Sequence, residues 1–181
     1  MSKKEDRKKY IEIRKNMPET LKRDKSLRIC EEVRKIVEKG DFEALLLYAP
    51  LTDEVDVFPL FETYKGKVKT AFPRVIGDNM DFYIVNDEKD LETGSFNVRE
   101  PKEYSELISF EADKKYICIV PGVSFDKKGA RIGYGKGYYD KFFTRYKDKN
   151  IYKLGVCFDE CFSENIESDE FDVFVDKVVQ F

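Results

Sequence analysis

Residues 116–146 read YICIVPGVSFDKKGARIGYGKGYYDKFFTRY and indicate the fold class of the chain. The first five residues, Tyr116–Val120, are a short run that is apolar on both faces, which is typical of a buried parallel strand. A glycine-rich loop leaves the carboxyl end of this strand, and residues 138–146 have a helical pattern. The order strand, loop, helix predicts a three-layer α/β domain with a mostly parallel sheet flanked by helices. Ligands of such folds bind beyond the carboxyl ends of the strands.

The loop itself has the composition of a phosphate site. Gly133, Gly135 and Gly137 alternate with other residues, and glycine lets a ligand approach the main chain closely. Backbone N–H groups in such a loop can point at one anion. Lys136 adds a mobile positive charge, and Arg131 adds a forked donor suited to phosphate oxygens. A turn that merely joins strand to helix is the alternative, and it leaves these two cations unexplained.

The residues after the loop add a candidate metal ligand and exclude two better-known phosphate loops. Asp140 lies one turn into the predicted helix, where a carboxylate suits Mg²⁺ beside phosphates. A P-loop requires Ser or Thr after its Gly-Lys pair, but Gly137 follows Lys136. The dinucleotide fingerprint requires a glycine three places after Gly135, but that residue is Tyr138.

Composition limits the chemistry further. The 181 residues are 41% apolar and 38% charged, which predicts one soluble domain spanning residues 1–181. The chain has no histidine, which excludes Ser-His-Asp and Cys-His catalysis and histidine-ligated metals. Of the four cysteines, Cys30 and Cys118 fit core positions. Cys157 and Cys161 lack the CxxC spacing, so we expect neither disulfides nor structural zinc.

Charge is unevenly distributed along the chain. Residues 1–28 hold 11 Lys/Arg against 5 Asp/Glu, which is a net charge of +6. Since the whole chain has a net charge of −3, residues 29–181 have a net charge of −9. The basic segment fits an anionic small ligand, a solvated helix face or nucleic acid, and the acidic remainder argues against the last. The longest apolar run, residues 44–49, is too short to span a membrane, and no signal peptide is apparent. We therefore expect a cytoplasmic protein.

The rest of the chain alternates helical and extended patterns without a repeat or a linker. Tyr10, Ile13 and Met17 form an apolar stripe on the first helix, and Leu27, Cys30, Val33 and Val37 are expected to face inward on the second. Residues 91–104 are interpreted as a loop with an extended stretch at 98–101. The predicted helices are 2–16, 19–39, 55–64 and 138–146, and the predicted strands are 44–49, 68–72, 80–85, 116–120, 153–158 and 173–179.

The glycine-rich segment also resembles the signature of the 5-formyltetrahydrofolate cyclo-ligase (methenyltetrahydrofolate synthetase) family. The matching residues, in a run without gaps, are Pro121-Gly122, Phe125-Asp126, Gly129, Arg131-Ile132 and Gly133–Asp140. The resemblance extends more thinly over nearly the whole chain, including Glu100-Pro101. It implies a domain of the NagB/RpiA/CoA-transferase type and an ATP- and Mg²⁺-dependent conversion of 5-formyltetrahydrofolate to 5,10-methenyltetrahydrofolate. A monomer acting on small molecules, without nucleic acid or membrane, is expected.

The resemblance also implies a role for each matching residue. Mg²⁺ is assigned to Asp140 and Asp172, and the chemistry to Lys136, Arg131 and Tyr139. Folate is assigned to Ala49, Glu54, Tyr134, Gly135, Lys136, Gly137 and Tyr138. ATP is assigned to Lys3, Arg7, Arg131, Gly133, Tyr134, Gly135, Lys136, Gly137, Tyr138 and Tyr139.

The C-terminal part departs from the family pattern. Phe171 precedes Asp172 where the family has a histidine, Cys161 stands where a glutamine is common, and Glu167 where a proline is. The aspartate remains, so a second carboxylate for Mg²⁺ is still expected.

Two other functions remain open from the sequence. One is a sugar-phosphate isomerase-like enzyme with Glu54 or Asp126 as base, which would show no ATP turnover. The other is a non-catalytic nucleotide-binding or RNA-associated protein, whose binding to nucleic acid would depend steeply on salt.

Overall fold

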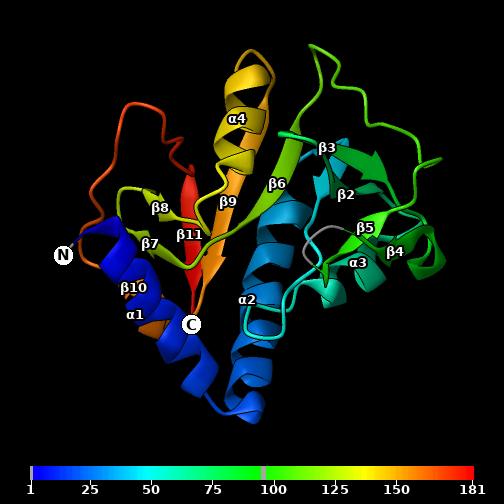
Figure 1. Ribbon diagram of the computed structural model, residues 1–181. Coiled ribbons are helices and arrows are strands. Elements are labelled where there is room, and N and C mark those ends of the chain that lie inside the picture. Colours follow the sequence, from blue (N-terminus) through cyan, green and yellow to red (C-terminus); the bar gives the residue numbers. More distant parts are fainter. Residues whose placement is uncertain (1, 95–96) are drawn as a thin grey trace.

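The computed structural model describes residues 2–94 and 97–181, and a six-stranded sheet forms its centre (Figure 1). The strand order is β11-β9-β6-β1-β2-β3, and all neighbours are parallel except β2 and β3. The mostly parallel sheet predicted from the sequence is therefore confirmed. The strands are β1 (Ala44–Leu46), β2 (Lys69–Ile76), β3 (Asn79–Ile84), β6 (Tyr116–Pro121), β9 (Ile151–Cys157) and β11 (Lys177–Gln180).

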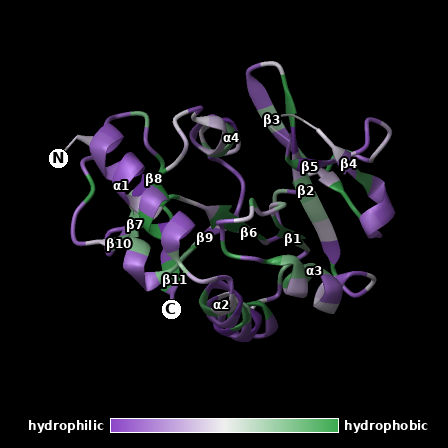
Figure 2. Cartoon of the chain, turned by 60° about the horizontal axis from the view of Figure 1, so that its bottom comes forward, coloured by the Kyte–Doolittle hydropathy of each residue, from purple (hydrophilic) through white to green (hydrophobic). Residues whose placement is uncertain are grey.

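Helices cover both faces of this sheet, as Figure 2 shows. On one face lie α2 (Glu19–Lys39) and α3 (Phe58–Tyr64), and on the other lies α4 (Tyr138–Arg145). Successive residues of a strand point to opposite faces, so Leu45 of β1 packs in the core under α2 while Leu46 packs in the core under α4. Both leucines are fully buried, which explains why β1 is apolar throughout.

A second, three-stranded sheet supports the first helix. It has the order β10-β7-β8, with β7 (Ser124–Asp126), β8 (Arg131–Ile132) and β10 (Phe162–Ser163). Helix α1 (Lys3–Asn16) begins at Ser2, which forms a capping box with Glu5. Tyr10 of α1 packs against Val123, Ile132 and Cys161 in a separate apolar cluster. The sequence did not predict this sheet, because its strands have only two or three residues each.

The connectivity creates a crevice beside β1. The chain passes from β1 to β2 on one side, whereas β6 pairs with β1 on the other side. At such a switch point the loops after the two strands diverge and leave room for a ligand. The loop after β1 carries Ala49 and Glu54, and the loop after β6 carries the glycines.

Helix α3 begins three residues later than predicted. Tyr48 donates a hydrogen bond to the carbonyl of Val55 (2.7 Å), and the Asp56 amide donates to Ser26 (3.1 Å). Pro59 has no N–H, so the Val55 carbonyl would have no donor in a helix that began at residue 55, whereas proline is favoured in the first turn, where the structure has it. The Asp56 carboxylate then accepts from the Phe58 amide (3.0 Å), where the helix starts.

Four further details differ from the sequence predictions. Leu27 is 45% exposed rather than inward-facing, because the buried stripe of α2 runs through Ser26, Cys30, Val33 and Val37. Residues 91–104 contain a hairpin of β4 (Leu91–Thr93) and β5 (Arg99–Pro101) rather than only a loop. Residues 95–96 of that prediction lie outside the described residues. The last strand begins at Lys177 rather than 173, and short 3-10 turns cover Glu88–Asp90 and Asp159–Cys161.

All four cysteines are buried and unpaired, in agreement with the expectation of no disulfide. Within residues 2–94 and 97–181, no helix is long and apolar enough to cross a bilayer.

Candidate functional site

A cavity of about 1010 Å³ opens at the carboxyl ends of β1 and β6. It is lined from both sides of the switch point and from helix α1. Every residue assigned to the site from the sequence lines it: Lys3, Arg7, Ala49, Glu54, Arg131, Gly133, Tyr134, Gly135, Lys136, Gly137, Tyr138, Tyr139, Asp140 and Asp172. The two substrates of a transfer reaction would fit together in a space of this size.

Two glycines of the loop have backbone conformations that other residues rarely adopt. Gly135 has φ +96 and Gly137 has φ +67. Gly137 is the residue before α4, and no side chain caps the helix there. The first amides of α4 therefore have no side-chain acceptor, and the positive end of the helix lies at the cavity.

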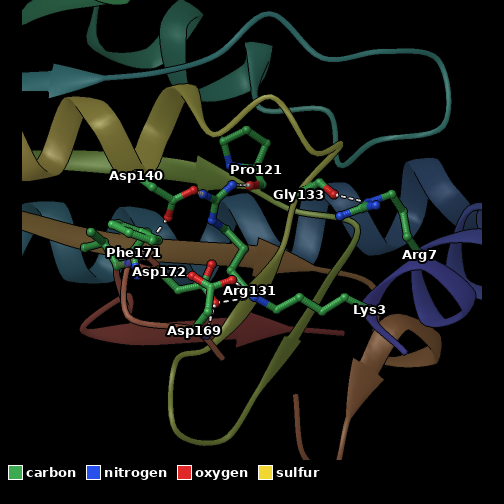
Figure 3. Close-up of polar contacts among 10 residues, drawn as sticks. Lys3, Arg7, Pro121, Arg131, Gly133, Asp140, Asp169, Phe171 and Asp172 are labelled. Carbon is green, nitrogen blue, oxygen red and sulfur yellow. Dashed lines mark hydrogen bonds and ion pairs between the residues drawn. The ribbon is translucent and has the colours of Figure 1, made fainter. Parts of the chain in front are cut away.

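Helix α1 contributes two cations to the same cavity. The Arg7 Nε donates to the carbonyl of Gly133 (2.7 Å), which joins α1 to the glycine loop. Lys3 pairs with Asp169 (3.1 Å) and with Asp172, as Figure 3 shows. Although burial lowers the pKa of Lys3, the hydrogen bonds to Asp172 and Asp169 outweigh this and raise it. Lys3 is therefore fully charged at neutral pH.

Arg131 lies on the opposite side of the loop and pairs with Asp140. Its Nη2 is 3.0 Å from Asp140 Oδ2, and its guanidinium lies 5.4 Å from the centroid of the Tyr139 ring. Figure 3 shows the Arg131 side chain between Pro121 and Asp140. The other Asp140 oxygen accepts from the amide of Val173 (3.1 Å). This bond brings Asp140 next to the segment that carries Asp172.

The two aspartates both line the cavity, and their oxygens are of the kind that Mg²⁺ prefers. Carboxylate oxygens are hard ligands, and Mg²⁺ in nucleotide sites is commonly held by one or two carboxylates together with phosphates and water. Among residues 2–94 and 97–181 no group of three or more acidic, histidine or cysteine residues is placed to hold a metal. Asp140 and Asp172 are each paired with a cation instead, Arg131 and Lys3.

Glu54 lies at the other end of the cavity and is 9% exposed. Its Oε2 accepts a hydrogen bond from the amide of Leu51 (2.9 Å), three residues earlier in the same loop. Burial raises the pKa of the Glu54 carboxyl, and the Leu51 amide and Arg14 oppose this rise only in part. Glu54 is thus a buried acceptor facing the ligand space.

Tyr134 and Tyr139 differ in their surroundings. Tyr134 lines the cavity, its hydroxyl accepts from Arg14, and burial raises its pKa to about 12. The Tyr139 hydroxyl is buried with no hydrogen-bond partner among the described residues, and burial raises its pKa well above the usual value. Its ring packs edge-on against Phe82. Tyr139 therefore offers an aromatic face and a protonated hydroxyl, and it is a poor general base.

Several cavity residues were not assigned to the site from the sequence, notably Glu100, Asp169 and Phe171. Phe171 is 76% exposed, an unusual position for a large apolar ring. The cluster at Glu54 contains the buried Arg14 as well. Arg7 follows Lys3 by four residues and Arg14 follows Arg7 by seven, which places all three on one face of α1. That spacing was the signal that could have identified it.

Asp126, a candidate base from the sequence, and Arg74, which lies between the cavity residues Pro73 and Val75, are both outside the cavity lining. Asp126 is fully buried, and its oxygens accept from the amides of Lys128, Ala130 and Ile166. It is a structural carboxylate rather than a candidate base. Arg74 pairs with Glu92 (3.0 Å) instead of reaching the ligand space.

Comparison with known proteins gives a consistent picture. Residues 1–180 match the model of the 5-formyltetrahydrofolate cyclo-ligase family. A Schizosaccharomyces pombe protein described as a probable 5-formyltetrahydrofolate cyclo-ligase is 30% identical over 154 residues, covering 78% of this chain and 76% of that protein. The solution structure of Aquifex aeolicus 5,10-methenyltetrahydrofolate synthetase superposes with a TM-score of 0.84 at 33% identity, over 99% of this chain and 90% of that one. A Mycoplasma pneumoniae synthetase at 23% identity shares the fold (TM-score 0.78, 98% of both chains).

Proposed function

The chain belongs to the 5-formyltetrahydrofolate cyclo-ligase family, and on that premise we propose that it converts 5-formyltetrahydrofolate to 5,10-methenyltetrahydrofolate at the expense of ATP. The products are the methenyl compound, ADP and phosphate. We place the reaction in the cavity at β1 and β6. We further propose that the protein acts as a monomer in the cytoplasm, without nucleic acid.

The chemistry that the site must support has two steps. The formyl oxygen attacks the γ-phosphorus of ATP, the bond to the bridging oxygen breaks, and ADP leaves. N10 then attacks the formyl carbon, the carbon–oxygen bond breaks, and phosphate leaves with the electron pair and takes up the N10 proton as the ring closes. Neither step requires a histidine, because the phosphoryl group turns a poor leaving group into a good one. The protein mainly positions two substrates and neutralises negative charge.

The cationic end of the cavity is proposed to hold ATP. Lys136 and Arg131 would contact the phosphates from the loop, and Lys3 and Arg7 from helix α1. The glycine-loop amides and the start of α4 would add neutral donors. In the free protein Lys3 and Arg131 are paired with carboxylates, so phosphate binding exchanges one anionic partner for another.

The released carboxylates are proposed to hold the metal. Asp140 and Asp172 would bind Mg²⁺ together with phosphate oxygens, because their oxygens fit this ion and they flank the same end of the cavity. When bound, Mg²⁺ would offset the negative charge of the phosphates.

The other end is proposed to hold the folate. Glu54 would accept hydrogen bonds from N–H groups of the pterin ring, and Tyr134 and Tyr138 would offer aromatic faces. Ala49 would lie against the ring, since it lines the cavity beside Glu54. Tyr139 would contact the formyl end through its ring or hydroxyl.

The observation that carries this proposal is that one cavity gathers cations, carboxylates, glycine-loop amides and Glu54. The test mixes protein, Mg-ATP and 5-formyltetrahydrofolate and follows the absorbance of the methenyl product. Product should form only with ATP present, together with an equal amount of ADP. Product formed without ATP, or ATP consumed without product, would refute the proposal. A sugar-phosphate isomerase is not favoured, since Asp126, one of its two candidate bases, is buried away from the cavity.

A further inference from the structure

We propose that Arg14 is a positioning residue for the folate end of the cavity, which holds Tyr134 and the loop that carries Glu54 in place. The inference rests on the proposed function, because it concerns the site assigned to folate. The hydrogen bonds of Arg14 go to Gly122, Asp53 and Tyr134, and none goes to the carboxylates proposed for Mg²⁺.

Arg14 joins the three parts of the chain that form this end of the site. From helix α1, its Nη1 donates to the carbonyl of Gly122 at the end of β6 (3.3 Å). Its Nη2 donates to Asp53 (3.0 Å), the neighbour of Glu54, and to the hydroxyl of Tyr134 in the glycine loop. One guanidinium thus fixes the distance between the loop after β1 and the loop after β6. The fork of arginine suits this task, because its donors diverge at fixed angles.

The Arg14 guanidinium and its partner Asp53 are more deeply buried than a surface ion pair. The side chain is 3% exposed, and Asp53 is 13% exposed. A buried charge is costly unless it is paired and hydrogen-bonded. The Nε of Arg14 is also buried and has no partner among the described residues. A core optimised for stability alone would not keep an unsatisfied N–H beside two carboxylates, so the cluster has the character of a functional site.

The charges around Glu54 show why Arg14 matters to it. The groups facing Glu54 are Arg14 on α1, Asp53 on the same loop, Tyr48 at β1, Tyr134 on the glycine loop and Tyr139 on α4. Of these only Arg14 is a cation. Burial and Asp53 both raise the pKa of Glu54, whereas Arg14 lowers it. Without Arg14, Glu54 would take up a proton at higher pH and lose an acceptor for the pterin N–H groups.

The experiment compares three variants with the parent protein. Arg14→Met removes the charge and keeps a side chain of similar length. Arg14→Lys keeps the charge without the fork. Arg74→Met is the matched control, since Arg74 is a largely buried, ion-paired arginine outside the cavity lining. For each protein the measurements are thermal unfolding, KM for each substrate from pH 5 to 9, and calorimetric binding of 5-formyltetrahydrofolate without ATP.

For Arg14→Met we expect KM for the folate to rise on the order of tenfold, and KM for ATP to stay within about twofold. The pH below which folate binding weakens should move upward, because Glu54 then stays protonated to higher pH. Arg14→Lys should restore the pH profile but only part of the affinity. The control should leave both KM values and the profile unchanged.

Equal rises in both KM values, or an unshifted pH profile in a folded Arg14→Met protein, would overturn the inference. If Arg14→Met does not fold, Tyr134→Phe gives the answer, since it removes only the hydroxyl that Arg14 holds. It should raise KM for the folate several-fold and spare KM for ATP, and an unchanged folate KM would refute the assignment. If the parent protein neither binds the folate nor forms product, the proposed function is refuted. If the parent does both and the variant is unaffected, only the role of Arg14 is refuted.

Discussion

Asp126 is the residue for which a structural and a catalytic role predict opposite results. In the structure its Oδ1 accepts from the amides of Lys128 (2.9 Å) and Ala130 (3.0 Å), and its Oδ2 accepts from the amide of Ile166 (2.9 Å). Asp126 itself is fully buried, and its bonds from Ala130 and Ile166 are buried, whereas the bond from Lys128 is part-buried. Asp126→Asn is nearly isosteric, so it changes the bonding without creating a cavity.

The expected cost follows from these three bonds. The asparagine oxygen can still accept from Lys128 and Ala130, but its NH₂ group would face the Ile166 amide. A buried N–H left without an acceptor costs about 1–3 kcal/mol, and the change from a charged to a neutral acceptor costs about 1 kcal/mol for each of the other two bonds. The total is about 3–5 kcal/mol. At about 2–4 °C per kcal/mol for a chain of this size, the melting temperature should fall by about 6–20 °C.

The assay is thermal and urea unfolding of Asp126→Asn, with ATP-dependent turnover measured well below the melting temperature. Asp113→Asn is the control, because Asp113 is exposed on a turn. The folded Asp126→Asn protein should turn over within a few-fold of the parent. A variant as stable as the control but inactive would refute the structural assignment and restore Asp126 as a candidate base.

Three further outcomes are expected. Lys136→Ala should fold normally, and its activation free energy for turnover should rise by about 2–4 kcal/mol, as when one preorganised donor is lost. Turnover like that of the parent would show that Lys136 does not contact the phosphates. Asp140→Asn and Asp172→Asn should each weaken the apparent affinity for Mg²⁺, and the double variant should cost less than the sum; strictly additive effects in Mg²⁺ titrations would contradict a shared ion. Because the pKa of Glu54 is raised from 4.5 in the folded protein, its stabilising contribution is present below that value and lost as pH rises through the raised pKa. Glu54→Gln should therefore gain stability relative to the parent between pH 4 and 8 in unfolding measurements, and a constant difference would contradict the raised pKa.

The features that the sequence predicted are those with local signals. Strands β1 and β6 are buried on both faces, so their apolar runs were sufficient to identify them. The glycine loop was recognised because its glycines, Arg131, Lys136 and Asp140 are all within ten residues of one another. Parallel strands then bring their carboxyl ends to one edge, which explains why the assigned residues line a single cavity.

The features that the sequence missed depend on distant partners. The spacing of Arg14 on α1 shows only that it shares a face with Lys3 and Arg7, whereas its partners Asp53 and Tyr134 are 39 and 120 residues away. The strands β7, β8 and β10 are too short to show a period, and β10 pairs with β7 across the intervening α4 and β9. Helix α3 starts at Phe58 because Pro59 suits the first turn of a helix, and the backbone before it is bound by Tyr48 and Ser26. None of these contacts is encoded in a window of neighbouring residues.

The pairing of Lys3 with Asp169 and Asp172 has a consequence for biosynthesis. The partners are 166 and 169 residues apart, so helix α1 can form these ion pairs only after residues 169–172 have been translated. Strands β1, β2 and β6 can assemble earlier, since domains begin to fold from the N-terminus during synthesis. The part of the cavity proposed to bind ATP is completed only after residues 169–172 have been translated. Truncation near residue 168 should therefore yield a protein with the central strands but without this part of the proposed site.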